Sequence, residues 1–167
     1  LLRNTAVFKH VFETSVKLWK RYIDDCGGIF YGQNSFDTFF KTLENQFNKF
    51  GLQLTHETST TRLILLDIEI YVANDSFYTN EYRKETASNS YIKFGSSHPS
   101  HCFKGIIKSQ MYRLRRLCSS NTDFLSAVND LKTRCTNSGY DHELVDSILN
   151  QAETLERHLT HRSTSTD

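Results

Sequence analysis

The chain has 167 residues, which is enough for one ordinary domain or two small ones. Its hydrophobic share of 38%, with 12 Phe and 8 Tyr, can form a core and argues against disorder. The net charge of +1 does not by itself indicate a nucleic-acid binder, and no apolar run approaches the roughly 18 residues of a membrane span.

The first third of the chain predicts a helix followed by a hairpin. Residues 1–17 carry a loose helical stripe of apolar side chains. Two short apolar runs, 18–23 and 29–31, are separated by acids and glycines, which is typical of two strands joined by a tight turn.

A phenylalanine-rich helix is expected next, over residues 35–50, as the buried helix behind the sheet. Ser35 can cap its start and Gly51 can end it. Strand-like stretches follow at 52–56 and 63–72. Together with the strand described next, residues 18–84 would thus run strand, strand, helix, strand, strand, strand.

The turn 73–76 leads into a further strand, 77–84, in which Tyr78 and Tyr82 share one face. The single proline, Pro99, marks a boundary. Three helices are predicted beyond it, at 105–119, 122–135 and 143–157. Asn121 and Asp141 are the expected N-caps of the second and third helices, and Gly139 would end the second. The polar tail, 161–167, is expected to be frayed.

The adjacent acids Asp24 and Asp25 are the strongest candidates for chemistry. Like charges so close repel each other, and a divalent cation resolves the repulsion. Mg²⁺ prefers one or two carboxylates together with substrate phosphate oxygens, and polymerases use two such ions. The alternative is an ordinary surface turn, because Asp and Gly are common turn residues.

Several motifs in order resemble the reverse transcriptases of Penelope-like retroelements. The segment 18–22 precedes the acid pair in the pattern Trp-x-Arg-Tyr-x-Asp-Asp, and a Leu-Asp strand follows around Asp67. The resemblance covers about residues 18–140 and includes the motifs Tyr82-Arg83-Lys84-Glu85-Thr86, Ser97-His98-Pro99, Lys104-Gly105 and Arg113-x-Arg115-Arg116-Leu117-Cys118.

The resemblance implies an α+β fold, a partial right-hand polymerase. Residues 1–94 would be the C-terminal part of the palm, with the Tyr22–Asp25 hairpin and a primer-grip hairpin, and 95–167 a helical thumb. The activity implied is RNA-directed DNA synthesis, a nucleotidyl transfer, with Mg²⁺ or possible Mn²⁺ as cofactor. The partners would be an RNA template, a DNA primer and deoxynucleoside triphosphates. The expected location is intracellular and nuclear, and no membrane partner is expected.

By carry-over, Asp24 should bind the catalytic metal, Asp25 should assist it, and Tyr22 should lie under the primer-template end. Since the chain starts without Met, and no upstream Asp or fingers segment precedes Trp19, we expect a piece of a longer protein whose N-terminal fingers and palm lie elsewhere. Residues 1–167 alone should not extend a primer, and an extension assay on that piece would test this.

Basic residues concentrate between Arg83 and Arg116, where the only acid is Glu85, which is the footprint expected for a phosphate backbone. The alternative is a solvated helix face. The residues expected to contact nucleic acid are Tyr78, Tyr82, Arg83, Lys84, Lys108, Arg113, Arg115 and Arg116, with the two tyrosines equally compatible with a core position.

Other interpretations stay open. Asp67 is expected to organise its hairpin or a neighbouring basic side chain rather than bind metal. A zinc site at His98, His101 and Cys102, with Cys118, lacks standard spacing, and the scattered cysteines predict reduced thiols in an intracellular protein. Cys26-Gly27-Gly28 stands where the family continues an apolar strand. Such a departure also fits a degenerate or domesticated copy that binds nucleic acid or protein without catalysis. A metal-free structural subunit is the third possibility.

Overall fold

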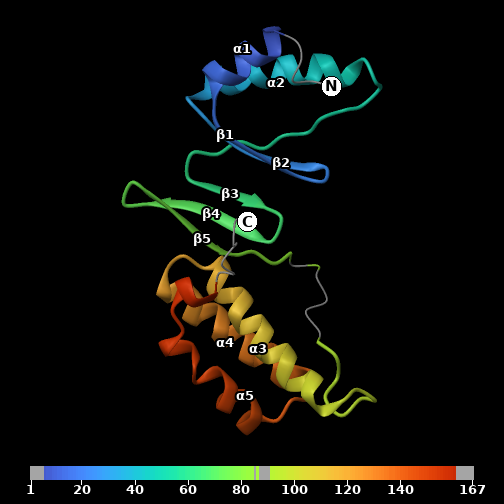
Figure 1. Ribbon diagram of the computed structural model, residues 1–167, viewed down its shortest axis with the longest axis vertical. Helices are drawn as coiled ribbons and strands as arrows, with labels where there is room; N and C mark the ends of the chain where they lie inside the picture. The colour runs from blue at the N-terminus through green and yellow to red at the C-terminus, as the bar shows by residue number, and fades with distance from the viewer. Residues whose placement is uncertain (1–5, 85, 87–90, 161–167) are drawn as a thin grey trace, which may run out of the picture. The chain divides into compact units, whose positions relative to one another are not determined.

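The computed structural model describes residues 6–84, 86 and 91–160. The expectations for Leu1, Leu2, Glu85 and the tail 161–167 therefore lie outside the described residues. The chain is α+β and divides into two compact units, residues 1–59 and 60–167, which are described separately (Figure 1). No helix among the described residues is both long and apolar enough to cross a bilayer.

The first unit is a hairpin covered by helices. Helix α1 (Ala6–Ser15) leads into β1 (Val16–Tyr22), which pairs antiparallel with β2 (Asp25–Phe30), and α2 (Gln33–Asn48) follows. The predicted hairpin and phenylalanine-rich helix are therefore confirmed. Helix α2 begins two residues before Ser35, with Gly32 as its N-cap, so the predicted serine cap is wrong.

Aromatic packing holds the first unit together. Phe39 of α2 is 1% exposed and lies edge-on to Trp19, with ring centroids 5.1 Å apart, and against Phe30 at 5.3 Å. Phe12 of α1 closes the cluster at 6.1 Å from Phe39. Aromatic rings packed in this way bury much apolar surface and fix the helices against one face of the hairpin.

Residues 52–59, for which a strand was predicted in part, form no regular structure, so the strand prediction for 52–56 is wrong. The segment instead places His56 against the rings of Phe36 and Phe40, with centroids 5.1 and 4.1 Å away. A strand needs a hydrogen-bonded neighbour, and none of the described strands pairs with this segment.

The second unit begins with a three-stranded antiparallel sheet in the order β3 (Arg62–Leu65), β4 (Ile68–Ala73) and β5 (Ser76–Glu81). The single strand predicted over 63–72 is thus two strands, separated by a turn at Leu66 and Asp67. Asn74 and Asp75, both with positive φ, form the next turn, as a type I′ turn requires.

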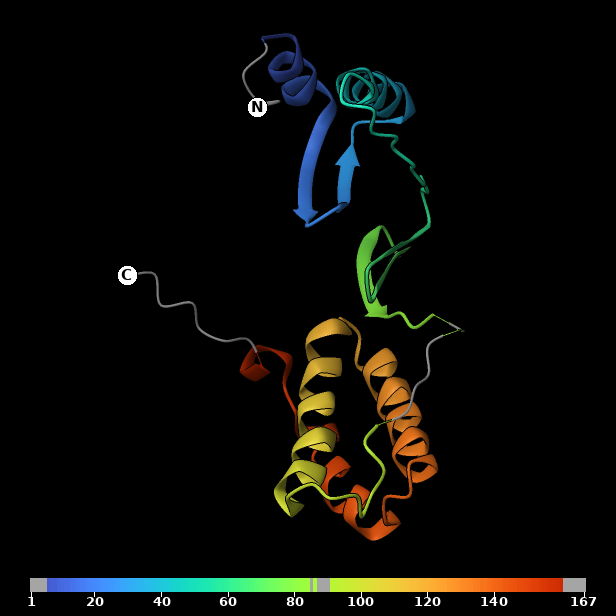
Figure 2. The ribbon, with the colours of Figure 1, turned by 90° about the vertical axis from the view of Figure 1, so that its right-hand side faces the viewer.

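Three helices complete this unit: α3 (Ser100–Leu117), α4 (Asn121–Asn137) and α5 (His142–Leu149), followed by short 3-10 turns at Ala152–Thr154 and Arg157–Thr160. Helices α3 and α4 run side by side in both views (Figure 2). Asp141 caps α5 as predicted, whereas Ser120 rather than Asn121 caps α4. Gly139, with φ of 84°, follows the end of α4.

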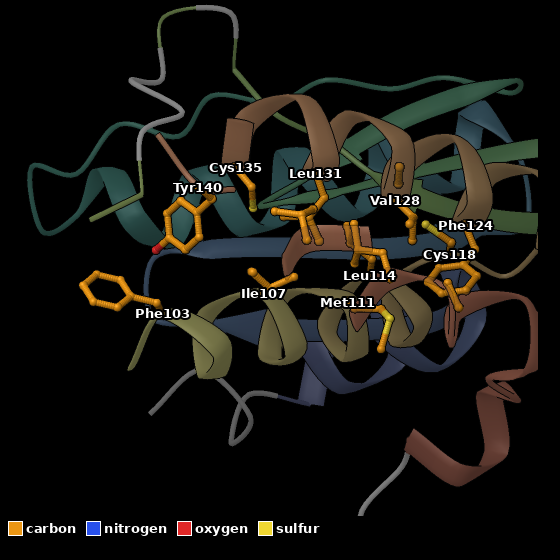
Figure 3. Close-up of a cluster of buried hydrophobic side chains, with 14 residues drawn as sticks. Phe103, Ile107, Met111, Leu114, Cys118, Phe124, Val128, Leu131, Cys135 and Tyr140 are labelled. Atoms are coloured by element: carbon orange, nitrogen blue, oxygen red, sulfur yellow. The ribbon is translucent and has the colours of Figure 1, made fainter. Parts of the chain in front are cut away.

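The helices enclose the main hydrophobic core (Figure 3). Its fully buried members include Ile107, Met111 and Leu114 of α3, and Leu131 of α4. These positions recur every three or four residues, which gives each helix one apolar face. Helix α5 is shorter than the predicted 143–157, because the chain turns after Leu149 and offers the Leu155 carbonyl to Arg115.

The sheet and the helices of the second unit are joined by hydrogen bonds. The backbone N–H of Ser119 donates to the Thr79 carbonyl at 2.8 Å, and the Thr79 hydroxyl donates to the Leu117 carbonyl at 2.6 Å. The β3–β5 sheet, which the sequence assigned to the palm, therefore belongs to the same compact unit as the helices assigned to the thumb. The boundary between the two units falls between Ser59 and Thr60.

Candidate functional site

The paired acids lie at the tip of the first hairpin. Tyr22 pairs with Asp25 across the two strands, so Ile23 and Asp24 are the two residues of the loop. Ile23 has a φ of +52°, the conformation that a type II′ turn gives to its first loop residue and that glycine normally supplies. A β-branched residue in this region is strained, and such strain is concentrated at functional sites.

The tip of this hairpin is open to solvent. Tyr22 is 62% and Ile23 is 76% exposed, and both carboxylates are exposed. Neither carboxylate makes a hydrogen bond or an ion pair with any described side chain. Two exposed carboxylates that form no ion pair with a described residue therefore lie next to each other at this turn.

Gly28 has a packing role in this hairpin, which bears on the proposed drift of Cys26-Gly27-Gly28. It lies opposite Trp19, and a Cβ added to it would come within 2.8 Å of the Trp19 ring and 3.0 Å of the Phe30 ring. The absence of a side chain thus admits the indole. Strand β2 stays paired from Asp25 to Ile29 without a bulge, so the glycines do not displace Asp25 from its register.

The donor set fits part of a site for a hard cation. Asp24 and Asp25 supply carboxylate oxygens, the ligands that Mg²⁺ prefers. Desolvation raises the pKa of the neighbouring Cys26 thiol; Arg21 lowers it, and Asp25 raises it again. The net rise disfavours the thiolate, which is the form of cysteine that binds metals. Within the described part of the chain, no three His, Cys, Asp or Glu residues come together as a complete metal cage.

A second hairpin turn offers an internal comparison. Leu66 and Asp67 form the two-residue loop between β3 and β4, and Leu66 has a φ of +57°. The loop thus repeats the apolar-residue and aspartate order of Ile23 and Asp24. Here, however, Asp67 forms an ion pair with Arg113 of α3, as predicted for an acid that organises a basic neighbour.

Glu81, at the end of β5, is a residue that the sequence interpretation missed. Its side chain is 6% exposed and accepts hydrogen bonds from Arg83 at 2.8 and 2.9 Å and from Arg113 at 2.5 Å, and Arg134 lies 3.9 Å away. The signal was available, because Glu81 immediately precedes the stretch of bases.

The residues expected to contact nucleic acid fall into two groups. Arg115 is 9% exposed, donates to the Leu155 carbonyl at 2.9 Å and lies over the Phe124 ring at 4.7 Å. With Arg83 and Arg113 bound to acids, three of the expected contacts make internal bonds. The exposed ones are Lys84, Lys108 and Arg116.

The two tyrosines are half-buried, and both contact their own hairpin or its turn. The Tyr78 ring stacks on Tyr71 at 5.5 Å, and the Tyr82 backbone N–H donates to the Asp67 carbonyl at 2.9 Å. A shallow pocket of about 270 Å³ lies beside them, lined by Leu66, Asp67, Glu81, Tyr82, Arg83, Lys84 and Arg113.

The residues of the zinc alternative have other contacts. His98 shares a hydrogen bond with the Ser96 hydroxyl at 3.0 Å, and Cys118 is buried, with its thiol donating to the Asn80 side chain at 3.3 Å. All four cysteines are free thiols.

Comparison with protein families gives one match: the model of the animal helix-turn-helix domain matches residues 90–150, which contain α3, α4 and α5. No curated protein and no solved structure matches the chain. The match concerns the helical part of the second unit and does not include either hairpin turn.

Proposed function

We propose that the chain is the C-terminal palm and the thumb of an RNA-directed DNA polymerase of the Penelope-like kind. The observation that supports the proposal is that two exposed acids are adjacent at the tip of the first hairpin: Asp24 is the second residue of the two-residue loop, and Asp25 directly follows it as the first residue of β2. The strained Ile23 and the resemblance of several ordered motifs support it.

The two hairpin turns explain why Asp24 is assigned to metal and Asp67 is not. Both aspartates are the second residue of a loop whose first residue has positive φ. Asp67 is neutralised by Arg113, whereas neither Asp24 nor Asp25 forms an ion pair with a described residue; the nearby Arg21 lies opposite Cys26. Two neighbouring carboxylates repel each other unless a cation binds, so this turn is the one suited to Mg²⁺.

In the proposed site, Asp24 holds the metal and Asp25 assists it. Bound magnesium ions would supply the activation of a primer 3′-hydroxyl and the stabilisation of the leaving pyrophosphate. The aromatic cluster of Phe39, Trp19 and Phe30 packs α2 against the hairpin that carries the turn. Tyr22, exposed beside the acids, would support the primer-template end.

In the second unit the helices would grip the RNA–DNA hybrid through its backbone. Three exposed bases lie on α3: Lys104 and Lys108, four residues apart, share one face of the helix, and Arg116 lies about 80° round the helix from Lys108. Proteins that follow a backbone without reading bases use such cations. The match to a helix-turn-helix domain over 90–150 is compatible with nucleic-acid binding by these helices.

Primer extension by the complete protein that contains this chain tests the proposal. The wild type should extend a DNA primer on an RNA template with Mg²⁺, and Asp24→Asn and Asp25→Asn should each abolish extension. Asp75→Asn is the matched control, because Asp75 is also an exposed turn carboxylate and should leave extension unchanged. Extension by Asp24→Asn at the wild-type rate would exclude the metal role.

A second candidate, a nucleic-acid-binding module without catalysis, is favoured by the helix-turn-helix match alone. A wild-type protein that binds the hybrid but extends no primer would select it. Calorimetry with Mn²⁺ on residues 1–167 provides a separate readout. Heat that Asp24→Asn removes and Asp67→Asn keeps would support the metal site, and equal heats for wild type and Asp24→Asn would indicate that the turn binds no metal.

A further inference from the structure

Arg113 joins the second hairpin to helix α3 through two acids. One terminal nitrogen of its guanidinium donates to Glu81 at 2.5 Å, and the other forms an ion pair with Asp67. Glu81 belongs to β5 and Asp67 to the β3–β4 turn, so one side chain of α3 reaches both a strand and a turn of the sheet. A planar guanidinium is suited to such a bridge, because its donors have fixed directions.

The bridge is largely desolvated on the Glu81 side. The Glu81 side chain is 6% exposed and also accepts two hydrogen bonds from Arg83. Without Arg113, Glu81 would keep Arg83 as a partner, whereas Asp67 would lose its ion pair, so the connection between the β3–β4 turn and α3 depends on Arg113. The β3–β4 turn needs such a restraint, because Leu66 is a non-glycine residue with a φ of +57°.

We propose that Arg113 is a positioning residue: it locks the β3–β4 turn and β5 onto α3, so that hairpin and helices meet a nucleic acid as one body, and it is not itself a phosphate ligand. This rests on the proposed function for its nucleic-acid partner. Arg113 is half-buried and its charge is already balanced by two carboxylates, so a phosphate at this position would have to compete with Glu81 and Asp67. Arg116, three residues further along α3, is exposed and makes no ion pair with a described residue; its Nε donates to the Tyr112 carbonyl at 3.4 Å, which leaves its terminal nitrogens for the phosphate contact.

Salt dependence of binding distinguishes the two roles. The complete protein would be titrated with an RNA–DNA hybrid over a range of KCl concentrations. Arg113→Ala and Asp67→Asn should each weaken binding several-fold with the same salt slope as the wild type, and the double variant should be no weaker than the weaker single variant. Arg116→Ala is the matched control and should reduce the slope by about 1, the value of one phosphate contact.

Arg113→Lys keeps the charge and removes the fork. A positioning role predicts that it behaves like Arg113→Ala, whereas a phosphate ligand would be rescued by lysine. A reduced salt slope in Arg113→Ala, together with tighter binding in Asp67→Asn, would overturn the proposal, because loss of an acid beside a phosphate contact should favour the polyanion.

Hydrogen exchange separates failure of this inference from failure of the proposed function. Arg113→Ala and Asp67→Asn should both accelerate amide exchange in residues 62–73 relative to the wild type, whether or not a hybrid binds. If the wild type binds no hybrid but exchange accelerates, the polymerase proposal fails and the locking of the turn remains. Unchanged exchange in both variants would refute the lock itself, and the melting temperature of each variant would identify one that does not fold.

Discussion

At the residue scale, two hairpin turns of this chain each contain a non-glycine residue with positive φ, but only one of the two is stabilised by an ion pair between described residues. Ile23 and Leu66 occupy equivalent places in two hairpin loops, and each is followed by an aspartate. The strain at Leu66 is balanced by the ion pair of Asp67 with Arg113. The strain at Ile23 has no such balance among the described residues, which is why its turn is the candidate for ligand binding.

Replacing Ile23 with glycine tests this strain. Ile23→Gly should raise the free energy of unfolding by about 1 kcal/mol, because relief of the strained φ exceeds the entropic cost of glycine. Primer extension by the complete protein should fall, since the turn loses its single conformation. Chemical denaturation and the extension assay measure the two effects.

Leu18→Gly is the control for this substitution. Leu18 is 45% exposed and lies in β1 with an ordinary negative φ, so glycine there should lower the free energy of unfolding by about 1 kcal/mol. Equal destabilisation by both glycine variants would mean that the Ile23 turn is not strained.

At the scale of the element, α3 combines two kinds of arginine that the sequence does not distinguish. Arg115 lies over the Phe124 ring and donates to the Leu155 carbonyl, whereas Arg116 is exposed. Arg115→Ala should lower the free energy of unfolding by about 2 kcal/mol through lost packing and an unpaired carbonyl. Arg116→Ala should change it by less than about 0.5 kcal/mol in thermal or chemical melts.

Strand β4 and helix α4 are joined by a hydrogen bond that depends on pH. The Tyr71 hydroxyl donates to Asp123 at 2.6 Å, and this bond, with desolvation and the Asp123 charge, raises the pKa of Tyr71 to about 12. A phenol whose pKa is raised by folding stabilises the protein fully below the unfolded value near 10 and loses that contribution as the pH rises toward 12.

Tyr71→Phe should therefore reduce stability at pH 8 and change it less at pH 12. Urea denaturation of the wild type and the variant at several pH values measures the difference. Tyr31→Phe, at an exposed tyrosine, is the control and should show no such dependence. A constant difference between wild type and Tyr71→Phe from pH 8 to 12 would contradict the assigned bond.

The same scale shows what could be predicted from the sequence. Hydrophobic alternation and helical spacing predicted the first hairpin, α2, α3 and α4, because these elements bury one face against a core. The strand predicted at 52–56 failed because pairing is decided by a partner far away in sequence. The turn at Leu66 and Asp67 was missed because Leu66 is not a usual turn former and because an arginine 46 residues away stabilises the turn.

The candidate site was predicted in the same uneven way. The acids at 24 and 25 are adjacent in sequence, so their proximity needed no tertiary information. The roles of the arginines did need it. Burial of Arg115 and pairing of Arg113 with Glu81 arise from contacts between separate elements, which composition does not reveal.

At the scale of the whole molecule, the chain has two cores with different chemistry. The first is aromatic and centred on Phe39, and the second is mainly aliphatic, with Leu131 fully buried in α4. The proposed metal turn belongs to the first unit, and the helix-turn-helix match to the second. The division assigns the two proposed activities to separately packed parts of the chain.

Truncating each core tests this division. Phe39→Ala should cost about 4 kcal/mol and Leu131→Ala about 3 kcal/mol, because each leaves a cavity in a closed core. Hydrogen exchange should show lost protection within residues 6–59 for the first variant and within residues 60–160 for the second, since protection follows the local cooperative unit.

Matched controls come from the same elements or their neighbours. Phe50, just after α2, is 72% exposed, and Leu125, in α4, is 37% exposed. Phe50→Ala and Leu125→Ala remove the same atoms from these exposed positions, so both should leave hydrogen exchange nearly unchanged. Loss of protection over both units in Phe39→Ala would show a single cooperative fold. In that case a substitution in the core behind the hairpin would also alter nucleic-acid binding by the helices. A loss of primer extension could then be assigned to the Asp24–Asp25 turn only after nucleic-acid binding had been measured for each variant.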